Sequence, residues 1–304
     1  MHIEHPAGVV VVLALLIAAS TPTVAAATSA TKPSKPSSAA VSTTTLTFVD
    51  ANRQRTLETM VLSPRRSAGP APLLIFVHGY DQSPSDYRNL LKAWASAGYI
   101  VAAPKFPSTN RDAASLDSSD YTNEPMDVSF VISQVVTQSA APTGPLSGRV
   151  DPNRIGVAGH SLGAEVVLGL LNRCCRDPRV RAAISLAGSE QFNPGEPAFP
   201  TAGYFVGPPI PLLLVHGDAD HENNYNRSVT AFAGAPPPKF FETIHGGDHR
   251  HPYQDALTRP GAHAVSTITV DFLDAYLKGQ PAALTRLGPD GTVPNVATLQ
   301  AAPS

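Results

Sequence analysis

The feature that most constrains this chain is the pentapeptide at residues 159–163, Gly-His-Ser-Leu-Gly, which has the pattern G-x-S-x-G. It directly follows a short apolar run, 154–158, and precedes a run of helix-forming residues, 164–172. This order predicts a strand, a sharp turn and a helix, with Ser161 presented at the turn. Such a turn strains the serine backbone, and a glycine two residues away on either side leaves room for the neighbouring strand and helix.

Strand and helix patterns alternate from about residue 45 to residue 279. The continuous apolar runs 72–77 and 211–215 predict strands buried on both faces. Alternation of this kind predicts an α/β protein with a mostly parallel central sheet and helices on both faces. A G-x-S-x-G turn between a strand and a helix is typical of the α/β-hydrolase fold. Further strands are expected at 45–49, 56–62, 99–103, 154–158, 180–186 and 239–244, and helices at 87–97, 126–139, 164–172, 226–233 and 263–277.

The connection between the strand ending at Leu186 and the strand beginning at Pro211 is about 24 residues long. That length is too short for a large helical cap domain. The connection carries the aromatic residues Phe192, Phe199, Tyr204 and Phe205. We therefore expect a fairly open site with an aromatic loop nearby.

A serine nucleophile needs a histidine base and an acid that orients it. In the α/β-hydrolase order the acid follows the serine, and here residues 216–220, His-Gly-Asp-Ala-Asp, end a buried strand. We assign Asp220 as the acid, because the turn after His216 and Gly217 lets the second aspartate reach back over the sheet edge. Asp218 is the alternative, and its competing role is to cap that turn.

The base is expected at the end of the next strand, in residues 245–249. We assign it to His249, because His245 lies too close to its strand and His251 adjoins a proline on the far side of the loop. These histidines have acidic neighbours but none of the fixed spacings of a metal site, so no metal is predicted.

Residues 78–80, His-Gly-Tyr, end the first buried strand. In this architecture that loop supplies an oxyanion donor, so the backbone amides of Tyr80 and Leu162 are the expected pair. The Tyr80 ring is also a candidate to line the substrate pocket, the alternative being an aromatic that covers the sheet edge. We expect structural roles for His78 and His160.

Residues from about 46 to 279 resemble bacterial secreted α/β-hydrolases of the group that includes platelet-activating-factor acetylhydrolase-like, chlorophyllase-like and cutinase- or polyester-hydrolase-like enzymes. The segments that carry the resemblance are 76–80, 159–163, 213–220 and 246–249. The resemblance implies a serine esterase that needs no cofactor. It implies the catalytic triad Ser161, Asp220 and His249 and the oxyanion donors Tyr80 and Leu162.

Two features depart from the cutinase-like members of this group. In the turn that presents Ser161, this chain has His160 where those enzymes often have an aromatic residue such as tryptophan. The cysteines, Cys174 and Cys175, are adjacent and lie just after the elbow helix, whereas several polyester hydrolases have a C-terminal disulfide. The pair forms either a vicinal disulfide or two thiols. A polyester substrate therefore stays an alternative.

The sequence predicts a carboxylic-ester hydrolase that works through an acyl-enzyme, acting on a small-molecule, lipid or polymer ester. An acyltransferase is an alternative, and a non-catalytic binding protein is least favoured because all three triad residues are present. The net charge of −2 gives no basic surface for nucleic acid. We expect a monomer.

The two ends of the chain differ in composition from its middle. Residues 1–27 predict a signal peptide with an apolar stretch at 7–19 and a small-residue cleavage site, the alternative being an uncleaved anchor. Residues 28–44 predict a disordered linker rich in Ser, Thr, Ala and Pro, 45–282 the catalytic domain, and 283–304 a loose tail. This organisation predicts a secreted protein without stable membrane insertion after cleavage.

Overall fold

A computed structural model describes residues 1–2, 40–188, 199 and 203–304, and within them the chain forms a nine-stranded sheet of order β1-β2-β4-β3-β5-β6-β7-β8-β9. The strands are β1 (Val41–Asp50), β2 (Arg55–Pro64), β3 (Ala71–Val77), β4 (Ile100–Pro104), β5 (Val150–His160), β6 (Val180–Leu186), β7 (Leu212–Gly217), β8 (Lys239–Ile244) and β9 (Ala297–Ala302).

The six inner strands, β3 to β8, run parallel to one another, and β1, β2 and β9 are antiparallel additions at the two edges. Every residue of β3 and β4 is buried, which explains why these strands are continuous apolar runs in the sequence. Parallel strands end at a common edge of the sheet. The loops that follow β3, β5, β7 and β8 therefore gather there.

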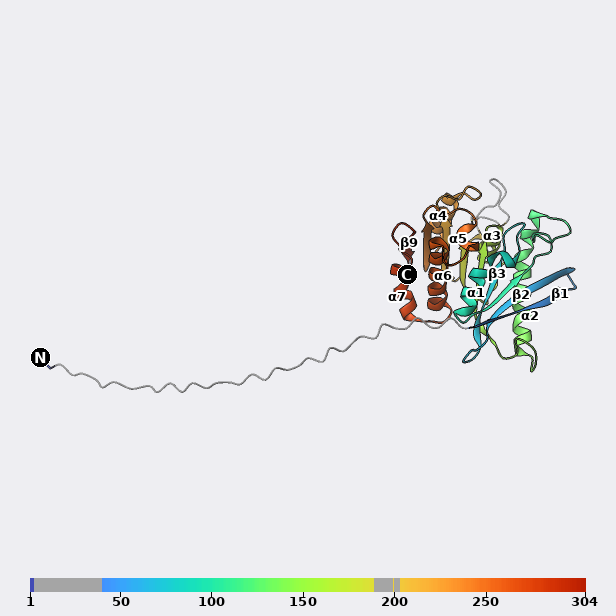
Figure 1. The fold of residues 1–304 in the computed structure, drawn as a ribbon, viewed down its shortest axis with the longest axis horizontal. Coiled ribbons are helices and arrows are strands. Elements are labelled where there is room, and N and C mark those ends of the chain that lie inside the picture. Colours follow the sequence, from blue (N-terminus) through green and yellow to red (C-terminus); the bar gives the residue numbers. More distant parts are fainter. Residues whose placement is uncertain (3–39, 189–198, 200–202) are drawn as a thin grey trace. The chain divides into compact units, whose positions relative to one another are not determined.

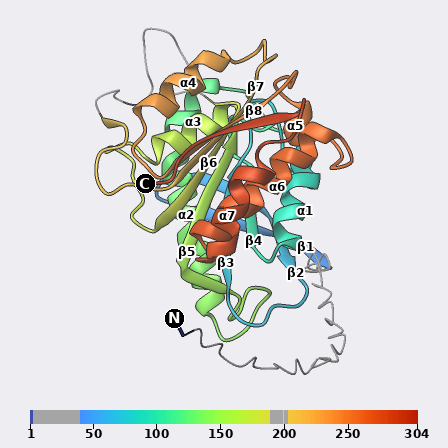
Figure 2. The ribbon, with the colours of Figure 1, turned by 90° about the vertical axis from the view of Figure 1, so that its left-hand side faces the viewer.

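Helices cover both faces of the sheet (Figures 1 and 2). The helices are α1 (Arg88–Ser96), α2 (Glu124–Ala140), α3 (Leu162–Gly169), α4 (Tyr225–Gly234), α5 (His251–Gln254), α6 (Pro260–Tyr276) and α7 (Pro281–Asp290), with 3-10 turns η1 (Pro84–Tyr87) and η2 (Ser118–Thr122). The apolar faces of α2, α3 and α4 form one core layer, and those of α1, α6 and α7 form the other. This arrangement confirms the predicted α/β-hydrolase fold.

The C-terminal segment 283–304 is ordered, so the prediction of a loose tail is wrong. Helix α7 buries Ala283 and Leu287, and β9 pairs antiparallel with β8 along its whole length, Ala297 lying opposite Ile244. The sequence shows no apolar pattern for this strand because it lies at the edge of the sheet, where Thr298, Gln300 and Ala301 are exposed. The tail therefore completes the sheet.

The predicted linker 28–44 is too long at its C-terminal end, because Val41 to Thr44 already pair with β2. The predicted signal peptide, 1–27, and the rest of the linker fall outside the described residues except for Met1 and His2. In the described ranges, no helix has both the length and the apolar character needed to cross a bilayer.

Candidate active site

Ser161 stands between β5 and α3, where the G-x-S-x-G pattern predicted a turn. Its backbone angles are φ 55° and ψ −121°, in the positive-φ region that side chains other than glycine rarely adopt. The strain is sustained by the strand and helix that hold the two sides of the turn. The predicted order of strand, turn and helix is therefore confirmed.

The glycines beside Ser161 are required by close backbone contacts. A Cβ atom at Gly159 would lie 2.1 Å from the Gly163 carbonyl oxygen, and one at Gly163 would lie 2.2 Å from the Val77 carbonyl oxygen. No side chain fits at such distances. The second contact also fixes the start of α3 against the end of β3, so the elbow and the loop after β3 are packed together.

Ser161, His249 and Asp220 form one chain of hydrogen bonds, although each comes from a different loop. His249 Nε2 lies 2.8 Å from Ser161 Oγ, and His249 Nδ1 lies 2.7 Å from Asp220 Oδ2. A carboxylate can only accept, so Nδ1 carries the proton and Nε2 is left to accept from the serine hydroxyl. The structure thus brings together the three residues that the sequence analysis selected, in the arrangement that proton transfer from serine requires.

The side chain of Asp220 is fully buried and accepts hydrogen bonds from several donors. Its Oδ1 atom accepts from the backbone amides of Glu222 and Asn223, both at 2.8 Å, and Oδ2 accepts from His216 as well as from His249. Burial alone raises the pKa of the Asp220 carboxyl, but hydrogen bonds from His216 and His249 outweigh it and hold that pKa well below its usual value. The carboxylate is therefore charged at neutral pH.

His216 is a site residue that the sequence analysis missed. Its Nε2 atom lies 3.0 Å from Asp220 Oδ2 and its Nδ1 atom lies 2.7 Å from the Ser228 hydroxyl of α4, so it links the acid to a helix. The signal was present, because His216 sits on the strand that precedes the acid, four residues earlier. The sequence analysis names His216 only as a residue at the strand end before the turn.

The rejected candidates lie elsewhere. Asp218 accepts from the Gly246 amide (2.7 Å) and contacts His245 Nδ1 (3.0 Å), whose other ring nitrogen contacts the Thr298 hydroxyl at 2.8 Å. His251 is largely exposed and pairs with Asp248. The structure joins none of these to Ser161. Asp218 therefore fastens two neighbouring loops together, where the sequence analysis had considered a cap on its own turn.

The amide of Leu162 is positioned to receive negative charge beside Ser161. Leu162 is the first residue of α3, so its amide has no carbonyl one helical turn earlier to which it could donate. Amides at a helix start also carry the positive end of the helix dipole. A group at this place can stabilise an oxyanion that develops next to the serine.

The loop that carries Tyr80 packs directly against the nucleophile. A Cβ atom on Gly79 would lie 3.2 Å from the Ser161 Cβ atom. The Gly79 carbonyl lies 2.8 Å from His78 Nδ1, while His78 Nε2 accepts from the Phe106 amide, and burial lowers the pKa of His78 to about 4. Neutral His78 thus donates to that carbonyl. Because the peptide bond between Gly79 and Tyr80 is trans, the Tyr80 N–H group points in the direction opposite to the Gly79 carbonyl, away from His78.

Two exposed features lie near the residues of the triad. Tyr80, in the loop that packs against Ser161, is 38% exposed. A hollow of about 760 Å³, lined by Asp218 and residues 220–227, opens beside the acid loop. Of the predicted aromatic loop, Phe199 is buried in the core and Phe192 falls outside the described residues. Within the described part of the chain, no group of three or more His, Cys, Asp or Glu is placed to hold a metal ion.

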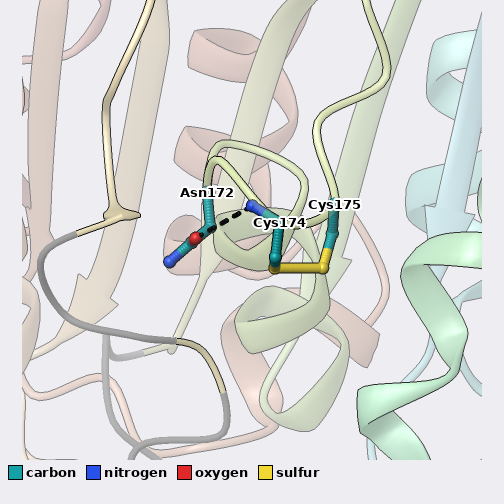
Figure 3. The surroundings of a disulfide bond; sticks show 3 residues. All are labelled: Asn172, Cys174 and Cys175. Carbon is teal, nitrogen blue, oxygen red and sulfur yellow. Dashed lines mark hydrogen bonds between the residues drawn. A yellow bond between two sulfur atoms is a disulfide. The ribbon is translucent and has the colours of Figure 1, made fainter.

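Cys174 and Cys175 form a vicinal disulfide (Figure 3). The sequence allowed either this bond or two free thiols. The Asn172 side chain accepts from the Cys174 amide at 3.3 Å, as the dashed line in the figure shows. The disulfide follows the C-terminal end of α3, whereas Ser161 lies at the N-terminal end. It therefore takes no part in the triad.

Comparisons with known proteins agree with the fold. The family model of chlorophyllase matches residues 35–184. The uncharacterized protein YfhR of Escherichia coli (strain K12) is 27% identical over 131 residues, which are 39% of this chain and 46% of YfhR. YfhR of Escherichia coli O157:H7 is 26% identical with the same coverage. The chain thus spans about half the length of the curated relatives that it matches.

The fold and the geometry define an α/β-hydrolase, and the chlorophyllase match is to a family of that fold. The matched residues contain Tyr80, Ser161 and Leu162 but end before the strand that precedes Asp220. The acid and the base therefore rest on the geometry described above. The likenesses to platelet-activating-factor acetylhydrolases and to cutinases stay predictions.

Proposed function

We propose that this protein is a serine hydrolase that cleaves carboxylic esters through an acyl-enzyme intermediate. The observation that carries the proposal is the hydrogen-bonded chain Ser161–His249–Asp220 at a strained turn. Ester hydrolysis is also supported, at the general level, by the match to the chlorophyllase family. The apolar stretch and small-residue site at 1–27 support a secreted location.

The reaction follows from the positions of the polar atoms. Ser161 Oγ attacks the ester carbonyl while its proton passes to His249 Nε2, and Asp220 stabilises the imidazolium that forms. The carbonyl oxygen becomes an oxyanion, which accepts from the amides of Leu162 and Tyr80. His249 then gives its proton to the leaving alcohol. Water, activated by His249 in the same way, releases the acyl group and restores Ser161.

The exposed features near the triad bear on the substrate. Tyr80 is 38% exposed in the loop that packs against Ser161, and a polar hollow lies beside the loop that carries Asp220. These features favour an ester with one solvent-exposed part, whether the rest belongs to a small molecule, a lipid or a polymer. Tyr80 is the residue that we expect to contact it.

The test is hydrolysis of p-nitrophenyl esters from acetyl to palmitoyl by the purified protein beside Ser161→Ala. We expect kcat to fall by about 10⁴-fold or more in the variant, because the nucleophile is lost. A fluorophosphonate probe should label the unmodified protein and not the variant. Retention of most of the activity by Ser161→Ala would refute the proposal. Labelling without ester turnover would redirect it to acyl transfer.

A further inference from the structure

His160, the residue before the nucleophile, connects two parts of the site through its side chain. The ring is fully buried at the end of β5. Its Nε2 atom lies 2.7 Å from the backbone carbonyl oxygen of His249, and its Nδ1 atom lies 2.7 Å from the hydroxyl of Tyr87. The sequence analysis expects a structural role at this position, and these contacts show which groups the side chain joins.

The partners of His160 fix its protonation. A carbonyl oxygen can only accept, so Nε2 carries a proton and donates to His249. Burial, and then the neighbouring His249, hold the pKa of His160 well below its usual value, so the ring is neutral and Nδ1 is bare. Nδ1 must then accept from Tyr87. A single tautomer satisfies both contacts.

The Tyr87 hydroxyl extends the network to the oxyanion loop. It accepts from the Gly79 amide at 3.2 Å, and it donates to the side-chain oxygen of Gln82. The one proton of Tyr87 is therefore shared between two acceptors, the Gln82 oxygen and His160 Nδ1. Tyr87 thus joins the loop of Tyr80 to the histidine that holds the base.

The bond to His249 matters because of where that residue lies. His249 is in the loop between β8 and α5, outside any helix or strand, so ladder hydrogen bonds do not fix its main chain. The His160 ring also packs against the His249 ring, at 4.9 Å between centroids, and against Tyr253 at 4.8 Å. Being neutral, His160 adds no positive charge beside an imidazole that becomes charged during the reaction.

We propose that His160, held by Tyr87, is a positioning residue that sets the direction of the His249 base toward Ser161. The proposal rests on the proposed function. Displacing a catalytic group by about 1 Å can lower a rate by about 100-fold. The bridge from Tyr87 through His160 to His249 therefore affects catalysis through geometry, and no atom of it contacts the ester.

The test compares three variants with the unmodified protein. His160→Phe keeps an aromatic ring but removes both hydrogen bonds, and we expect kcat for a small p-nitrophenyl ester to fall by about 10- to 100-fold with KM within about twofold. His160→Gln keeps a donor near the His249 carbonyl and should recover much of that loss. Tyr87→Phe should lower kcat less than His160→Phe does, since Nε2 still donates.

Two readouts separate positioning from general loss of structure. Fluorophosphonate titration counts competent sites, so kcat is expressed per labelled serine. The low-field proton NMR signal of His249 Nδ1–H, which reports the bond to Asp220, should shift or broaden in His160→Phe. Tyr253→Phe is the matched control: it is the same chemical change on another ring that packs against His160, and the Tyr253 hydroxyl donates to the Val215 carbonyl instead of to His160. It should leave kcat within about twofold.

A folded His160→Phe variant with kcat per labelled site within twofold of the unmodified protein would overturn the proposal. So would an equal effect of Tyr253→Phe. If the unmodified protein neither turns over esters nor reacts with the probe, the proposed function fails separately. The NMR signal then decides the positioning role, because an unchanged His249 Nδ1–H resonance in His160→Phe refutes it.

Discussion

Two aspartate–histidine pairs stand at the carboxyl ends of the same two strands, β7 and β8. Asp220 contacts His249 Nδ1 at 2.7 Å, and Asp218 contacts His245 Nδ1 at 3.0 Å. In each pair the second ring nitrogen lies 2.8 Å from a hydroxyl, that of Ser161 in the first and that of Thr298 in the second. The polar groups are thus the same, in the same order and at similar distances.

The two pairs differ in their surroundings. The side chains of Asp220 and His249 are 0% and 5% exposed, whereas those of Asp218 and His245 are 39% and 40% exposed. Water weakens electrostatic interactions, so the contact between Asp218 and His245 is weaker than the contact between Asp220 and His249. We call Asp218, His245 and Thr298 the outer relay, and Asp220, His249 and Ser161 the inner relay.

The hydroxyls of the two relays also differ. Ser161 lies on a strained turn at the start of α3, next to an amide without an intrahelical acceptor, whereas Thr298 lies in the exposed edge strand β9. An attacking oxygen needs donors for the charge that it creates on the carbonyl. The comparison teaches that burial and oxyanion donors, more than the three side chains, distinguish a catalytic site from a surface hydrogen-bond chain.

The largest expected effect comes from exchanging one aspartate oxygen for nitrogen in each relay. Asp220→Asn should lower kcat by about 10⁴-fold, because the amide favours the wrong tautomer of the base. Asp218→Asn should leave kcat within about twofold. The measurement is p-nitrophenyl ester hydrolysis by both variants, each checked for folding by circular dichroism. Similar losses in the two variants would contradict the distinction between the relays.

The inner relay was largely predictable because its signals are local or follow from topology. The strand, turn and helix around Ser161 are adjacent in sequence, and parallel strands place Asp220 and His249 at one edge. The outer relay was not predictable, because the composition of residues 283–304 indicated a loose tail and Thr298 lies in a strand there. No sequence motif links Thr298 to the loops that carry Asp218 and His245.

Contacts between side chains and distant main chain also escaped the sequence. His160 and His249 are 89 positions apart, and only the packed structure shows that the ring of one reaches the carbonyl of the other. His216 is four positions from Asp220, yet the direction of its side chain depends on how β7 ends. The mostly parallel sheet followed from alternation, and the α/β-hydrolase fold from the G-x-S-x-G motif, but such contacts depend on tertiary packing.

The pH dependence of the free energy of unfolding offers a second comparison between the buried Asp220 and the exposed Asp218. The pKa of Asp220 is lowered in the folded state, so its contribution to stability is present above its unfolded pKa of about 3.8 and is lost as pH falls through the folded value. Asp220→Asn should therefore reduce the free energy of unfolding by about 1–3 kcal/mol at pH 7 and flatten its acid dependence. Urea midpoints between pH 3 and pH 7 measure both.

Asp218→Asn is the control, and it should lower the free energy of unfolding by at most about 1 kcal/mol because the Asp218–His245 pair is exposed. If Asp220→Asn unfolds with the same acid dependence as the unmodified protein, the charged, strongly held carboxylate that we assign to the inner relay is wrong.

The smallest expected effect concerns the hydroxyl of the outer relay. Thr298→Val removes the contact to His245 Nε2 while keeping a β-branched residue suited to a strand. We expect the free energy of unfolding to fall by about 0.5–1 kcal/mol and the ester-hydrolysis rate to stay within about twofold. A loss of activity above tenfold in Thr298→Val would show that the outer relay serves the reaction after all, and would remove burial as the distinction between the two.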